Sequence, residues 1–142
     1  MKVLVLNCGS SSLKCQLIDM EKNERIMKGH YDRIGGSRSS LRFNVRGNKT
    51  VIEYPARNFE EAISKILRLL TSPEYNVIQS LDEIGAVGHR IVHGGEKFTE
   101  AVVIDDNVID AIEEYKKRLS KYTKIEIIEV SDIDNPSKDI VL

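Results

Sequence analysis

Alternating apolar and polar residues predict an antiparallel meander over the first third of the chain. The unbroken apolar run Val3–Leu6 is typical of a strand covered on both faces. Residues 13–17 alternate between apolar and polar, which indicates a second strand with one wetter face. The polar stretch Asn7–Ser12 separates these runs, so the two strands form a hairpin. Further strands are expected at residues 25–34, 41–45 and 50–54, between turn-forming clusters.

The hydrophobic period lengthens to that of a helix after Pro55. Asn58 is placed to cap the first free N–H groups, and apolar residues recur at helical spacing until about Thr71–Pro73. A strand-like run at Ile84–Val92 follows, and a second helix is expected after Asp105–Asp106.

The charge pattern changes after Tyr115. A basic block at residues 116–124 precedes an acidic block at residues 126–139. We therefore expect a folded domain over residues 1–115 and a divergent charged tail over residues 116–142. The tail is either a solvated, partly disordered segment or one extra strand through the apolar residues between 125 and 130.

Composition narrows the functional classes. The chain has 142 residues, enough for one core, and its 21 Lys and Arg against 22 Asp and Glu leave a net charge of −1. Such a balance argues against a nucleic-acid partner, and no apolar run approaches the ~20 residues of a membrane span. We expect a cytoplasmic protein whose Cys8 and Cys15 stay thiols that fill apolar space, with a hairpin disulfide as the alternative.

The turn Asn7–Ser12 has the chemistry of a phosphate site. It follows a buried strand, Gly9 permits close backbone approach, and the serine hydroxyls and nearby N–H groups donate hydrogen bonds. Lys14 adds a point charge, and Asn7 offers a neutral oxygen that could orient a metal-bound water. The motif is not a P-loop, because the GxxxxGK[ST] spacing is absent. An ordinary polar hairpin tip is the alternative interpretation.

A second candidate site lies at Gly88–Gly95, where a strand delivers Arg90 between two histidines. A planar guanidinium can hold a carboxylate or phosphate through two parallel hydrogen bonds, although a surface salt bridge is the alternative. His89 and His93 have a helical zinc spacing, but on a strand and turn that spacing does not converge, so hydrogen-bonded structural histidines are favoured. A Ser-His-Asp hydrolase is not favoured, because the sequence lacks the GxSxG motif of the nucleophile elbow.

These two motifs resemble the two signatures of the acetate kinase family. The first is Val3–Lys14, which reads VLVLNCGSSSLK, and the second is Gly85–Gly95, which reads GAVGHRIVHGG. The resemblance extends to about Tyr115, the first four-fifths of the chain. It implies an α/β fold, the first domain of the ribonuclease H-like, actin-like ATPase superfamily of acetate and sugar kinases, Hsp70 and actin. That domain has a mixed sheet with an antiparallel amino-terminal meander and flanking helices.

The resemblance also implies an activity and a set of site residues. Family members pass a phosphoryl group reversibly between ATP and acetate, giving acetyl phosphate and ADP, with Mg²⁺ spreading the charge. Asn7 and Arg90 correspond to catalytic positions, with Asn7 helping to place the metal indirectly. Arg90 and Val92 correspond to the acyl-substrate site, Val92 as an apolar wall, and the phosphate or ATP contacts correspond to Ser10, Ser12 and Lys14.

The chain departs from the family pattern after Tyr115. Family members are longer, and the catalytic aspartate, the later histidine and arginine and the adenosine-binding segment have no counterpart here. We therefore expect a domain shortened by truncation or a shifted reading frame, with little activity alone. A non-catalytic phosphate or acyl-phosphate binding remnant, a butyrate or propionate kinase-like fragment and a pure interaction domain are the alternatives. A homodimer is compatible with the sequence.

Overall fold

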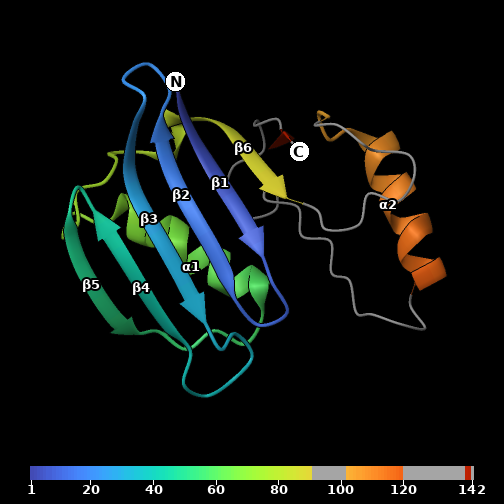
Figure 1. Cartoon of the computed structure of the whole chain (residues 1–142), viewed down its shortest axis with the longest axis horizontal. Helices are drawn as coiled ribbons and strands as arrows, with labels where there is room; N and C mark the ends of the chain where they lie inside the picture. Colours follow the sequence, from blue (N-terminus) through green and yellow to red (C-terminus); the bar gives the residue numbers. More distant parts are fainter. Residues whose placement is uncertain (91–101, 120–139, 142) are drawn as a thin grey trace.

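Among the residues that the structure describes, seven strands form one sheet, the main body of this part of the chain (Figure 1). The computed structural model describes residues 1–90, 102–119 and 140–141. The strands run in the order β5-β4-β3-β2-β1-β6-β7. They are β1 (Lys2–Cys8), β2 (Leu13–Asp19), β3 (Glu24–Asp32), β4 (Ser40–Val45), β5 (Asn48–Glu53), β6 (Ile84–Arg90) and β7 (Ile140–Val141). The helices are α1 (Phe59–Thr71), the short 3-10 helix η1 (Leu81–Glu83) and α2 (Asp106–Leu119).

The meander expected from the sequence is confirmed. Strands β1 to β5 pair antiparallel in chain order, and β6 then returns to pair with β1 in parallel. The sheet is therefore mixed, and β1 lies in its interior between β2 and β6. The pairing of β7 with β6, also parallel, was not foreseen. The extra strand considered between residues 125 and 130 lies outside the described residues.

The β4–β5 hairpin closes through a two-residue turn. Arg46 and Gly47 both have positive φ, of 48° and 93°, which is the backbone of a type I′ turn and suits the right-handed twist of the strands. The Asn44 side chain reinforces the turn by accepting from the Gly47 N–H at 2.8 Å. This turn fixes Val45 opposite Asn48 and thereby sets the register of β5.

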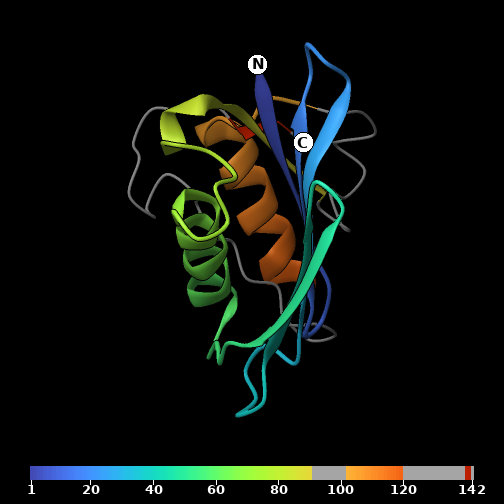
Figure 2. The same ribbon diagram turned by 90° about the vertical axis from the view of Figure 1, so that its left-hand side faces the viewer.

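The hydrophobic core lies between the sheet and α1. Asn58 caps the helix as expected, its side chain accepting from the Glu61 N–H at 2.8 Å. The apolar side of the helix packs on the sheet face that carries the alternate buried residues of β1 to β4. The only buried polar side chain among the described residues is Ser39, which is bonded to backbone groups of the turn and of Ala56. The helix thus covers one face of the sheet (Figure 2).

The opposite sheet face, called the open face below, has no described helix over it (Figure 1). α2 begins where expected, with the Asp105 side chain accepting from the Val108 N–H at 2.9 Å. It lies beyond β6, on the side of the sheet where α1 lies (Figure 2). The helix runs past residue 115 to Leu119, so the expected division at residues 115 and 116 falls inside it and stays a prediction. No helix in the described part of the chain is long and apolar enough to cross a membrane.

Gly29 on β3 is buried and lies opposite Cys15 of β2. A Cβ atom built there would lie 2.6 Å from the Cys15 sulfur, a distance that forces a neighbour to move. We expect Gly29→Ala to lower the free energy of unfolding by about 1–3 kcal/mol, which denaturant titration measures. In a Cys15→Ala background the same substitution has room, so the two effects should be less than additive. A neutral Gly29→Ala variant would contradict this packing.

Candidate functional site

The two sequence motifs meet at one end of the sheet. Asn7 lies opposite Arg90 in the parallel β1–β6 pair and opposite Lys14 in the antiparallel β1–β2 pair. Residues at paired positions project to the same face, and neighbouring strands lie about 4.8 Å apart. Lys14, Asn7 and Arg90 therefore form one row across three adjacent strands, on the open face. The backbone pairing therefore places Arg90 next to Asn7, the residue at which the serine turn begins.

The turn between β1 and β2 is closed by its own backbone. The Gly9 N–H donates to the Ser12 carbonyl at 2.7 Å, and the Ser11 carbonyl accepts from the Ile34 N–H at 2.9 Å. A Cβ at position 9 would lie 2.9 Å from the Ser12 hydroxyl, so Gly9 is required for a close approach within the turn. Its N–H is consequently not available to an anion, unlike the general expectation for this turn. The hydroxyls of Ser10, Ser11 and Ser12 have no partner among the described residues.

The row at the sheet end carries two positive charges that have no counter-ion among the described residues. The Lys14 and Arg90 side chains are exposed, and the Asn7 residue between them is partly buried and uncharged. Within the described residues neither cation forms an ion pair, so the surface salt bridge considered for Arg90 is not observed there. Two cations flanking a neutral amide, beside three hydroxyls without a described partner, form an arrangement that favours an oxyanion.

The core face of the same strand ends carries a thiol–imidazole pair. Cys8 Sγ lies 3.7 Å from His89 Nε2, and His89 Nδ1 lies 2.9 Å from the Arg90 carbonyl. The carbonyl can only accept, so the proton sits on Nδ1 and Nε2 is left to accept from the thiol. Burial lowers the pKa of His89, against the smaller raising effect of its backbone bond, and burial raises the pKa of Cys8 to about 11. Both groups are therefore uncharged near neutral pH.

This pair was missed by the sequence interpretation, which treated Cys8 as an apolar filler and His89 as a structural histidine. Both cysteines are free thiols, so the disulfide alternative is wrong, and His89 does form a structural hydrogen bond. The signal was available in the alternation of the two strands: Cys8 follows Leu4 and Leu6 on the core face, and His89 is the register partner of Leu6.

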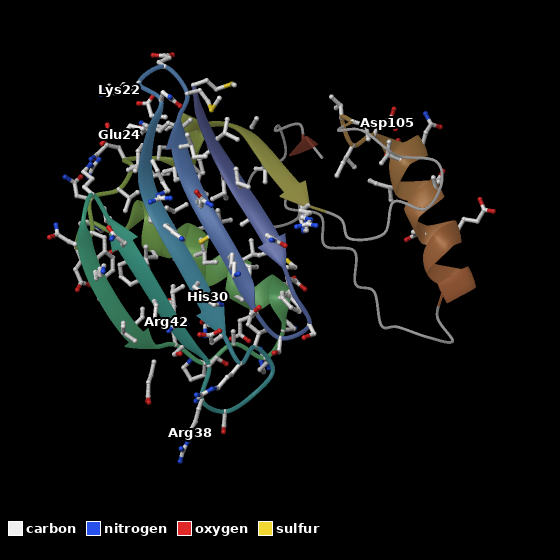
Figure 3. The ribbon with its side chains drawn as sticks, viewed as in Figure 1. Lys22, Glu24, His30, Arg38, Arg42 and Asp105 are labelled. Atoms are coloured by element: carbon white, nitrogen blue, oxygen red, sulfur yellow. The ribbon has the colours of Figure 1, made fainter. Side chains whose placement is uncertain are left out.

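A second polar cluster continues the row on the open face. His30 is the register partner of Lys14, and Arg42 is that of His30. Asp32 joins them, with its two carboxylate oxygens 3.0 Å from His30 Nε2 and 2.6 Å from Arg42 Nη2. Figure 3 shows His30 and Arg42 side by side on neighbouring strands. Because Asp32 binds the Arg42 guanidinium, this end of the row lacks the uncompensated charge of Lys14 and Arg90.

The remaining expected site residues cannot be placed. Val92 and His93 lie outside the described residues, so the apolar acyl wall and the histidine pair are untested. For the expected Mg²⁺, the described residues contain no cluster of three or more carboxylate, histidine or cysteine ligands. Magnesium in phosphotransfer sites needs at least one or two carboxylates besides phosphate oxygens. Asn7, a neutral amide, does not hold a metal by itself, and its expected indirect role through a metal-bound water stays a prediction.

Comparison with known families supports the two motifs. The model of the Acetokinase family matches residues 2–137. The acetate kinases of Clostridium botulinum (strain 657 / Type Ba4) and of Finegoldia magna are each 50% identical to the chain over 117 residues. Those alignments cover 82% of the chain and 30% of each relative, so the chain spans under a third of the length of these relatives.

Solved structures share the fold. Porphyromonas gingivalis acetate kinase matches 99% of the chain and 36% of its own, at 36% identity and a TM-score of 0.87. Entamoeba histolytica acetate kinase matches 99% and 34%, at 26% identity and a TM-score of 0.73. A propionate kinase from Francisella tularensis subsp. tularensis SCHU S4 matches 99% and 35%, at 23% identity and a TM-score of 0.76, which is a likeness of fold.

These matches confirm the expected fold class, the mixed α/β sheet of the actin-like ATPase fold with an antiparallel amino-terminal meander. The family model covers far more than half of the chain and includes both strand ends that carry the candidate site. The chain belongs to the acetokinase family.

Proposed function

We propose that this chain provides the acyl- and phosphate-binding edge of an acetate kinase-like phosphotransferase. In that reaction an acetate oxygen attacks the terminal phosphorus of ATP, the bond to the bridging oxygen breaks, and acetyl phosphate and ADP form; the reverse reaction regenerates ATP. The observation that supports the proposal most strongly is the register of Asn7 with both Lys14 and Arg90. Phosphoryl transfer relies on positioning and on charge stabilisation, which such a row can supply.

Each residue has a proposed role. Arg90 holds the acyl carboxylate or acyl phosphate through its planar fork, and Asn7 orients the phosphoryl oxygens between the two cations. Lys14 contributes charge, while Ser10 and Ser12 donate hydroxyl hydrogen bonds to the phosphate. The absence of counter-ions for both cations among the described residues supports these roles. Val92 as the apolar wall rests on the resemblance alone.

The proposal also covers the co-substrate, the cation, the location, the domain bounds and the partners. ATP or ADP is the proposed co-substrate, with Mg²⁺ as the divalent cation, and the proposed location is the cytoplasm. Residues 1–115 are the proposed domain, and residues 116–142 the proposed tail. Acetate is the proposed acyl substrate, with propionate and butyrate as the related alternatives. A homodimer is compatible with the proposal, and neither nucleic acid nor a membrane is a proposed partner.

The role of Arg90 can be tested by binding. We expect titration with acetyl phosphate to shift the amide resonances of Ser10–Ser12 and Arg90 in NMR spectra. Arg90→Ala should weaken this binding about tenfold to hundredfold, because charge-assisted hydrogen bonds are lost. The affinity of Arg90→Lys should lie between those of the wild type and Arg90→Ala.

Arg25→Ala is the matched control for this experiment. Arg25, on β3, is also exposed. It pairs with Ile18, whose partner on β1 is Val3, so it lies at the end of the sheet opposite to the Asn7 row. This substitution removes the same charge and should leave the affinity unchanged. Equal losses in Arg25→Ala and Arg90→Ala would contradict a site at the Asn7 row.

The protonation state of His89 provides an independent test. We expect long-range ¹H–¹⁵N spectra, assigned with His89→Gln, to show a neutral ring with its proton on Nδ1 at pH 7 and a pKa below the ordinary imidazole range. The unfolded chain then takes up the proton first, so the free energy of unfolding should decrease as pH falls through that range. His89→Gln should lack this component. A His89 pKa above the ordinary range would exclude the neutral pair.

A second candidate function is phosphate or acyl-phosphate binding without catalysis. It is favoured by the lack of a metal-ligand cluster in the described residues. A coupled assay for ADP formation from ATP, acetate and Mg²⁺ separates the two candidates. We expect acetyl phosphate binding with little turnover from this chain, because the described residues hold one side of a site at most. Robust turnover would favour the complete enzyme activity.

A further inference from the structure

In the part of the chain that the structure describes, no strand pairs with the outer edge of β5. β5 is the first strand in the sheet order, and it pairs with β4 on its inner side. Figure 2 looks onto this side of the molecule, and no described helix or strand lies beyond β5. Free strand edges present a row of N–H and C=O groups that pair readily with another chain, and proteins usually protect them.

The turn that joins β4 to β5 determines which groups point outward. A two-residue turn makes its flanking residues, Val45 and Asn48, a hydrogen-bonded pair, and such pairs alternate along an antiparallel ladder. Asn48, Thr50 and Ile52 therefore bond to β4. The backbone N–H and C=O groups of Lys49, Val51 and Glu53 point away from the sheet.

The side chains of these same three residues are self-complementary. They alternate onto the open face, where Lys49 and Glu53 lie two positions on either side of Val51. All three are exposed, and Val51, at 66%, is among the few large apolar side chains that are. In an antiparallel pair of two copies centred on Val51, Val51 would meet its counterpart, and each Lys49 would meet a Glu53.

We propose that the β5 edge binds the β5 edge of a second copy of this chain, with a two-fold axis at Val51. Val51 pairs with Val51 of the second copy, exchanging both backbone hydrogen bonds, and Lys49 pairs with Glu53 in the same manner on each side. Thr50 then lies opposite Ile52 on the core face. Ile52 already packs against the core, so the pairing extends the apolar layer across the axis.

The charges distinguish this arrangement from ordinary edge protection. A lysine on an edge strand normally repels a second strand. Here the opposite charge lies at the symmetry-related position, so repulsion becomes attraction in the register centred on Val51, in which the outward backbone groups also match. An interface of one short strand buries little area, so the association is a weak, reversible one that requires high protein concentration.

The experiment is a charge-swap series analysed by sedimentation equilibrium of the full chain at low salt. We expect the wild type to dimerise reversibly with rising concentration. Each single variant, Glu53→Lys or Lys49→Glu, places like charges opposite each other in both symmetry-related pairs. Each should weaken the dimer about tenfold or more. The double variant, Lys49→Glu with Glu53→Lys, recreates both pairs in reverse and should restore the dimer.

Two further variants serve as controls. Glu24→Lys changes net charge by the same amount as Glu53→Lys at an exposed position on β3, and should dimerise like the wild type. Val51→Pro removes an outward N–H while leaving the bonds to β4, so it should stay folded by circular dichroism and become monomeric. If it unfolds, the charge series decides.

Three results would each overturn the proposal. The first is a wild type that stays monomeric up to about 1 mM, above the range of weak specific association. The second is a dimer that neither single charge reversal weakens, since association would then use another surface. The third is a double variant that remains as weak as the single ones, which would exclude the Lys49–Glu53 register.

Discussion

The parallel alignment of β1 with β6 is the constraint on which the candidate site depends. Two sequence motifs separated by about eighty residues lie together only because their strands run side by side and end at the same edge of the sheet. The register then decides which side chains become neighbours. A shift by one residue would send Arg90 to the core face and His89 to the open face, since side chains alternate along a strand. Backbone pairing thus selects the guanidinium as the exposed group.

The two faces of this edge provide opposite environments within a few ångströms. On the open face Lys14 and Arg90 are exposed, without described counter-ions. On the core face, burial keeps both Cys8 and His89 uncharged, and their contact joins the end of β1 to the end of β6. Burial at this position disfavours the charged form of the His89 imidazole. The charge that can attract an anion is therefore confined to the side that water and ligand can reach.

Local patterns were sufficient to predict most of the elements. Alternation identified the strands of the meander, and the Asn58 and Asp105 caps marked where α1 and α2 begin. Pairing across long separations could not be obtained in this way, because it depends on the closed sheet. The β7 strand, the His30–Asp32–Arg42 cluster and the Cys8–His89 contact all arise from such pairing. The proximity of Asn7 to Arg90 was anticipated through family resemblance, and spacing alone did not indicate it.

The proposed association and the proposed site use distant parts of one sheet. Four strand spacings separate β1 from β5 in the sheet order, which corresponds to about 20 Å at the usual spacing between strands. Pairing through β5 would consequently leave two Asn7 rows ~40 Å apart, several times the Debye length of ~8 Å at physiological salt. The cations of one row cannot then influence an anion bound at the other through solvent. Any coupling between association and anion binding would have to pass through the sheet itself. Backbone hydrogen bonds hold its strands in register on both sides of the two-fold axis.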